Sequence, residues 1–166
     1  MKYSTKKITT LALSVSLALI FSFIESRIPA FVAIPGIKVG LANIAVIFTI
    51  YKLGIKEAIA VSLVRVFLVS ILFGSPVSLI YSISGATLSL LTMILLKKLT
   101  PLSEISISVS GAVMHNVGQI IAASFMLATN VVVYYLPFLI LSGVLAGIAV
   151  GVVSALLIKK VKISFK

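Results

Sequence analysis

Residues 132–157 read VVYYLPFLILSGVLAGIAVGVVSALL and contain no charged side chain. A helix needs about 20 consecutive apolar residues to cross the hydrocarbon core of a bilayer, and this stretch is longer than that. Lys159 and Lys160 follow it closely, as basic residues often do at a cytoplasmic membrane surface. The stretch therefore predicts a transmembrane helix.

Five further apolar runs precede this one along the chain. They extend over residues 8–24, 39–53, 55–73, 77–96 and 105–129. The second is short for a spanning helix. Gly74-Ser75-Pro76, Pro101 and Asn130 mark the last three connections, because glycine, proline and asparagine favour turns. The pattern predicts an all-α integral membrane protein with six transmembrane helices in a single domain, residues 1–166. We expect the first run to be retained as a helix, since no small-residue cleavage site follows it.

The composition does not fit a soluble protein, because 61% of the residues are hydrophobic and 10% are charged. The net charge of +11 is typical of nucleic-acid binding, but the basic residues lie between the apolar runs and indicate topology instead. If the N-terminus is cytoplasmic, eleven of the fourteen basic residues lie inside, as the positive-inside rule requires. These are Lys2, Lys6, Lys7, Lys52, Lys56, Lys97, Lys98, Lys159, Lys160, Lys162 and Lys166. We predict a multi-pass protein of the bacterial plasma membrane with both termini cytoplasmic.

The acidic and sulfur-containing residues exclude several classes of enzyme. All three acidic residues are glutamates, Glu25, Glu57 and Glu104, and the chain has no aspartate or cysteine. Paired-carboxylate catalysis, a Ser-His-Asp triad and a thiolate zinc site therefore cannot be built in the usual way. No phosphate-binding loop of the G-x-x-x-x-G-K-[ST] type occurs. The sequence predicts binding or transport, with no catalytic residue, metal or cofactor.

Arg65 lies near the middle of the run 55–73. A guanidinium at the centre of a membrane helix costs about 3 kcal/mol on insertion scales, so it needs a partner or water. Two interpretations remain open. Arg65 either ties neighbouring helices together or supplies the counter-charge for an anionic ligand.

Two neighbouring runs carry polar side chains at helical spacing. His115, Asn116 and Gln119 lie in the run 105–129, and Tyr81 lies in the run 77–96 together with Ser78 and Ser82. Residues three and four apart share one face of a helix, so these groups predict a polar cavity between the two helices. The alternative is that they only join the helices by hydrogen bonds, which we favour for the serines alone.

Small residues four apart form stripes on two of the predicted helices. Gly143, Gly147 and Gly151 predict close contact between two backbones. On the first helix, Ala12 with Ser16 and Ser14 with Ala18 form two shorter stripes, which either pack inside the protein or meet a partner. Between the first two helices, the stretch 25–43 favours a structured cap over the outer face. The alternative for that stretch is an anchor that dips into lipid.

The run Pro35-Gly36-Ile37-Lys38-Val39-Gly40-Leu41-Ala42-Asn43 and the segment Met114-His115-Asn116-Val117-Gly118-Gln119 carry a family resemblance. Together with six spans in a short chain, they resemble the substrate-capture (S) components of energy-coupling factor (ECF) importers, and within these the Gx transporter family. Proteins similar to this chain often carry the label heptaprenyl diphosphate synthase component I. The lack of aspartate argues against a synthase activity, so the label is a hint to the substrate class only.

The resemblance implies an ECF S-component-like bundle that binds a small vitamin-like cofactor precursor, isoprenoid- or quinone-related, for uptake through an ECF module of one membrane scaffold subunit and two ATPases. It places Lys38 and Asn43, on the first outer loop, near the ligand. It also places Ala12 and Ser16 against the scaffold, where the family's usual Ala-x-x-x-Ala is Ala-x-x-x-Ser in this chain. The predicted substrate-binding residues are thus Lys38, Asn43, Arg65, Tyr81, His115, Asn116 and Gln119.

Two other functions remain open from the sequence. One is a self-sufficient small transporter or channel, and the other is a membrane partner of a prenyl diphosphate synthase. The predicted partners are a small-molecule substrate and the lipid bilayer, with no nucleic acid.

The charge distribution predicts that reporter proteins fused to Lys166 and within residues 30–38 report opposite sides of the membrane. The fusion at Lys166 should be active with a cytoplasmic reporter such as a fluorescent protein, and the loop fusion with a periplasmic phosphatase. An external C-terminus would contradict the six-span topology.

Overall fold

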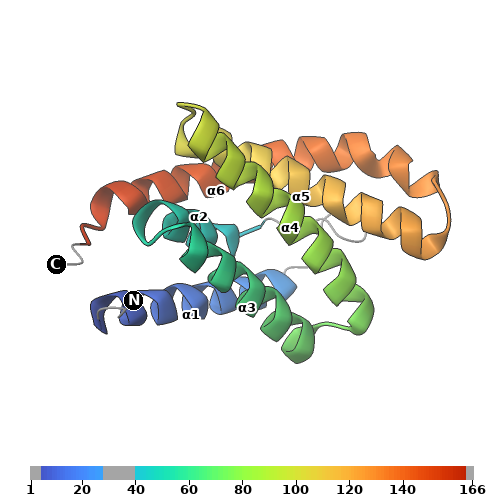
Figure 1. Ribbon diagram of the computed structural model, residues 1–166. Coiled ribbons are helices and arrows are strands. Elements are labelled where there is room, and N and C mark those ends of the chain that lie inside the picture. The colour runs from blue at the N-terminus through green and yellow to red at the C-terminus, as the bar shows by residue number, and fades with distance from the viewer. Residues whose placement is uncertain (1–4, 28–39, 164–166) are drawn as a thin grey trace.

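The computed structural model describes residues 5–27 and 40–163, which form six α-helices and one short 3₁₀ helix (Figure 1). In chain order these are α1 (Thr5–Arg27), α2 (Asn43–Lys52), α3 (Ile55–Phe73), α4 (Pro76–Leu99), α5 (Glu104–Leu127), η1 (Val131–Tyr135) and α6 (Leu136–Lys160). This part of the chain contains no strand. The all-α prediction is confirmed for it, and six helices follow the six apolar runs.

The predicted helix breaks at Gly74-Ser75-Pro76 and Pro101 are confirmed, and hydrogen bonds at the next helix explain them. The Ser75 hydroxyl accepts a hydrogen bond from the Ser78 amide, and the Ser78 hydroxyl accepts one from the Ser75 amide. This reciprocal cap, with Pro76 in the first turn, starts α4. After Pro101, the Ser103 hydroxyl caps α5 by accepting a hydrogen bond from the Ser106 amide.

Four stretches are long and apolar enough to cross a bilayer, namely α1, α4, α5 and η1 with α6. Helix α3 has 19 residues but carries Lys56, Glu57 and Arg65. Large apolar side chains cover the outer surface of the bundle, as Phe67 and Ile71 on α3 and Leu141 and Leu145 on α6 illustrate. An apolar outer surface of this extent is suited to lipid, so the chain is a membrane protein.

Helix α2 is shorter than the predicted span 39–53, because glycines bound it on both sides. Gly40 has a φ of +77° before the helix and Gly54 has a φ of +130° after it, and such angles interrupt a right-handed helix. Ten residues make a helix of about 15 Å, which is half of the roughly 30 Å hydrocarbon core. Helix α2 therefore does not cross a bilayer by itself.

Helix α2 nevertheless lies at the centre of the bundle, where it packs against α1, α3, α5 and α6. Val46, Ile47 and Ile50 are each only 1% exposed. They join buried side chains of the neighbouring helices, including Met93 of α4 and Ile107 of α5, in one apolar core. This core holds the bundle together along α2, from Ile44 to Ile50.

The glycine stripe of α6 packs against α5, as the spacing predicts. A Cβ atom on Gly147 would lie 2.6 Å from the Cα of Val109, and one on Gly151 would lie 2.8 Å from the Cα of Ile105. Both distances are too short for real carbon contacts, so only glycine allows the two backbones to come this close. We call this contact the glycine seam of α5 and α6.

Lysines gather at one end of the bundle, which we call the lysine end. The Lys7 ammonium lies 2.5 Å from a Glu57 carboxylate oxygen and joins the start of α1 to the start of α3. The Lys97 ammonium donates to the Ile50 carbonyl and lies over the Tyr51 ring, which joins the end of α4 to the end of α2. In Figure 1 the start of α1 and the end of α6 lie on the same side, with the α5–α6 connection on the other.

The seam predicts that Gly147→Leu destabilises the protein by about 1–3 kcal/mol or more, because the new side chain must push α5 away. Thermal unfolding in mild detergent measures the change. Ala149→Leu is the matched control, since Ala149 is exposed on the same helix and its longer side chain meets lipid or detergent. Equal melting temperatures for the two variants would contradict the packing described here.

Candidate functional site

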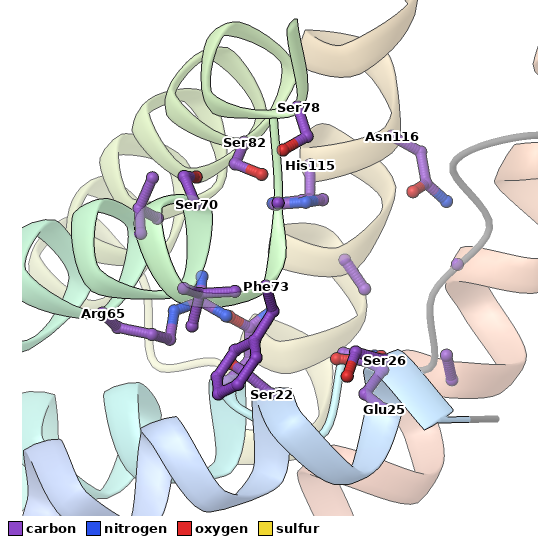
Figure 2. Close-up of a pocket in the computed structure, with 18 residues that line it drawn as sticks. Ser22, Glu25, Ser26, Arg65, Ser70, Phe73, Ser78, Ser82, His115 and Asn116 are labelled. Carbon is purple, nitrogen blue, oxygen red and sulfur yellow. The ribbon is translucent and has the colours of Figure 1, made fainter. Parts of the chain in front are cut away.

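A cavity of about 160 Å³ lies among the six α-helices, where α1 ends and α2 begins (Figure 2). Every α-helix contributes to its lining, and α2 does so through its first residue, Asn43. Its polar side chains are those of Ser22, Glu25, Ser26, Asn43, Arg65, Ser70, Ser78, Ser82, His115 and Asn116. Valines, alanines and Phe73 supply the apolar part. A concave site with a mixed lining of this kind is typical of small-molecule binding.

Arg65 extends from α3 into the lining of this cavity (Figure 2). Its Nε atom is buried and has no hydrogen-bond acceptor among the described residues. Glu25, on α1, contributes a carboxylate to the lining of the same cavity. Arg65 thus shares a cavity with a carboxylate and has an unused donor, which keeps both sequence interpretations of this residue open.

Glu25 connects the end of α1 to the start of α2. One of its carboxylate oxygens accepts a hydrogen bond from the Gly40 amide. Ser22 lies one turn earlier on the same helix and is buried with Ser14 and Ala18, so these three face the bundle. Helix α1 therefore presents its polar face to the cavity near its C-terminal end.

Asn116 lines the cavity from α5 and also ties that helix to α6. Its side-chain amide donates to the Leu139 carbonyl at 2.6 Å. Gly143 makes room for it, since a Cβ atom there would lie 3.0 Å from the Asn116 Nδ2 atom. Gly85 of α4 similarly makes room for His115, whose Cε1 atom would lie 2.9 Å from a Cβ atom at that position. Small residues on α4 and α6 thus hold the polar residues of α5 in place.

The structure brings together four of the predicted binding residues, Asn43, Arg65, His115 and Asn116. Tyr81 and Gln119 were predicted with them but do not line this cavity. Lys38 lies outside the described residues.

Gln119 instead faces the contact between α4 and α5. Its Cγ atom would lie 3.0 Å from a Cβ atom at Gly85. Its Oε1 atom is buried and accepts no hydrogen bond from the described residues.

Sequence reasoning missed the part of the site that α1 and the end of α3 provide. Glu25, Ser22, Ser26 and Ser70 were not predicted to bind substrate. A signal for Ser22 was present, because it continues the Ser14 and Ala18 stripe by four residues. The presence of Glu25 in the same cavity as Arg65 depends on how α1 crosses α3, which spacing along one helix does not reveal.

The chemistry of the described lining suits recognition of a small polar molecule. Arg65 is its single basic side chain apart from His115, and Glu25 is its single carboxylate. Hydroxyl and amide groups can both donate and accept hydrogen bonds. A volume of about 160 Å³ is below the ~300–1,000 Å³ of pockets for drug-sized ligands, so the ligand that fits this form is small.

The sequence model of the family described as heptaprenyl diphosphate synthase component I matches residues 14–157. The match includes every residue that lines the cavity. No curated protein and no solved structure matches the chain. The protein belongs to the heptaprenyl diphosphate synthase component I family.

The two amide side chains of α5 should respond differently to truncation. Asn116→Ala removes the hydrogen bond to Leu139, so we expect a loss of about 0.5–1.5 kcal/mol in stability without ligand. Gln119→Ala removes an oxygen that has no such bond and should cost less. Thermal unfolding of the ligand-free variants checks the order. Equal losses would contradict the described role of Asn116 in joining α5 to α6.

Proposed function

We propose that this member of the heptaprenyl diphosphate synthase component I family is the membrane-embedded S component of an ECF-type importer. It binds a small vitamin-like cofactor precursor, and the ATP chemistry that drives uptake lies in separate ATPase subunits. The observation that carries the proposal is the mixed polar cavity among all six helices, at the opposite end of the bundle from the paired lysines. Such a cavity suits capture from one side of the membrane.

The proposed topology has six crossings with both termini in the cytoplasm. Lysines concentrate where α1 and α3 begin and where α4 and α6 end, and the positive-inside rule assigns that end to the cytoplasm. The cavity then faces the outside of the bacterial plasma membrane. Helix α2 runs from the cavity toward the cytoplasm and contributes the inner half of the second crossing.

The two small-residue stripes of α1 point in different directions, which supports a partner for one of them. Ser14 and Ala18 are buried in the bundle, whereas Ala12 and Ser16 are exposed. The Ser16 hydroxyl donates to the Ala12 carbonyl, so it does not need a polar group of another helix. A small, internally satisfied surface permits close approach of a neighbouring helix. We propose that the scaffold subunit of the ECF module packs here.

Affinity purification from the bacterial membrane in mild detergent tests this assignment. The wild-type chain should recover one membrane scaffold subunit and two ATPases, and Ser16→Trp should lose them because the bulky ring blocks the close contact. Ala149→Trp is the control, since it places the same ring at an exposed alanine of α6. Retention of the partners by Ser16→Trp would refute the proposed contact.

The family's description favours a second candidate function, a membrane partner of a prenyl diphosphate synthase. The same purification distinguishes the two. Recovery of a soluble synthase with aspartate-rich motifs, and of no ATPase, would favour the second candidate. Transport by the purified chain in liposomes would instead favour a self-sufficient transporter.

A further inference from the structure

We infer that the ligand of the cavity carries a carboxylate or a phosphate group and that this group binds the Arg65 guanidinium. The inference names a chemical class of ligand for the cavity, and it rests on the proposal that the cavity is the substrate site. Two observations carry it. Arg65 has a buried donor without an acceptor among the described residues, and the whole sequence offers few carboxylates that could pair with it.

Arg65 is enclosed by the bundle and reaches the cavity. Its side chain lines the cavity and remains partly exposed (Figure 2). Its buried Nε–H group has no acceptor among residues 5–27 and 40–163. A guanidinium keeps its charge at every physiological pH, so Arg65 does not become neutral in this setting. A bound molecule that supplies oxygens to the guanidinium therefore gains affinity.

The carboxylates of the whole chain leave Arg65 with one candidate partner in the protein. The acidic side chains of the sequence are Glu25, Glu57 and Glu104. Glu57 forms an ion pair at the lysine end, and Glu104 begins α5 and does not line the cavity. Residues 28–39 add no acidic side chain. Glu25 is therefore the only carboxylate of the chain that lies at the cavity.

Glu25 does not satisfy the Arg65 donor. One of its oxygens accepts a hydrogen bond from the Gly40 amide and so joins α1 to the residues before α2. The Nε–H group of Arg65 stays without an acceptor although Glu25 lines the same cavity. The described residues therefore bring a guanidinium to the cavity without a full set of acceptors, and a ligand oxyanion can supply them.

A carboxylate or a phosphate suits Arg65 better than a neutral polar group does. The parallel N–H groups of a guanidinium fit two oxygens of either oxyanion. Hydrogen bonds in which the groups are charged are about twice as strong as those between neutral groups. Ser70 and Ser82 also line the cavity, and a hydroxyl can rotate to donate to the same oxygens.

The direct test compares matched probes on the full-length protein in phosphatidylcholine nanodiscs. Butyrate and butyramide have the same shape, and only butyrate is charged. Inorganic phosphate represents the other oxyanion, and butylamine is the cationic control. Isothermal titration measures each Kd. We expect butyrate, phosphate or both to bind roughly tenfold or more tightly than butyramide and butylamine, because hydrogen bonds between charged groups contribute at least that much.

Variants of Arg65 give a readout that a merely structural role would not produce. Arg65→Gln should reduce the preference for the oxyanion over butyramide to about twofold or less, because the charge is lost. Arg65→Lys should keep part of the preference, since an ammonium keeps the charge but lacks the fork of donors. The preference is a ratio of two affinities of one variant, so a smaller folded fraction does not change it.

Arg27→Gln is the matched control. Arg27 is exposed at the end of α1 and does not line the cavity, so the variant removes a positive charge without altering the lining. It should keep the wild-type preference.

The inference is overturned if butyramide or butylamine binds the wild-type chain as tightly as both oxyanions, if no probe binds, or if Arg65→Gln keeps the wild-type preference. An anionic lipid headgroup is another source of the same chemistry, so the titration is repeated with phosphatidylglycerol in the nanodiscs. Complete loss of binding there would place a lipid phosphate at Arg65 and overturn the small-molecule ligand. Retained binding would support it.

These outcomes are separate from the importer proposal. Failure of the oxyanion probes would leave that proposal intact as long as the scaffold and ATPases still co-purify. Oxyanion binding at Arg65 without these partners would have the reverse meaning. The two proposals can therefore fail separately.

Discussion

Because α2 has only ten residues, it fills the centre of the bundle over only part of the bundle's height. A helix of about 15 Å occupies half of a hydrocarbon core of roughly 30 Å. Its apolar side chains fill the half toward the lysine end, together with Met93 and Ile107. The cavity starts where the helix starts, at Gly40 and Asn43. The position of the site thus follows from where glycine allows α2 to begin.

Much of the fold could be predicted because lipid imposes a simple rule on sequence. Each spanning helix needs an apolar run, and the breaks between runs need residues such as Pro76 or Pro101 that a helix interior rejects. The start of α2 was harder to place, because residues 39–53 remain apolar through the turn that precedes Asn43. Hydropathy does not distinguish a short buried helix from the end of a spanning one.

The site was predicted to the extent that it lies on single helices. His115 and Asn116 were found because two large polar groups on one membrane helix need partners, and Arg65 because a charge in lipid needs one. Gln119 was placed with them, yet its Cγ atom lies at the α4 contact beside Gly85. A difference of one turn on α5 decides which polar group meets the cavity, and only the crossing of the helices fixes that turn.

A ligand in this cavity faces a closed path toward the lysine end. Between the cavity and that end, Ile47 and Ile50 are almost fully buried, and Lys97 binds the Ile50 carbonyl while Lys7 pairs with Glu57. Interiors packed in this way do not open by small fluctuations, so release toward the lysine end requires the helices to move relative to one another. A bound molecule drives such a movement only if it binds the two arrangements of the helices with different affinities. The packing toward the lysine end therefore supports the proposed work with a separate energised partner over that of a channel that acts alone.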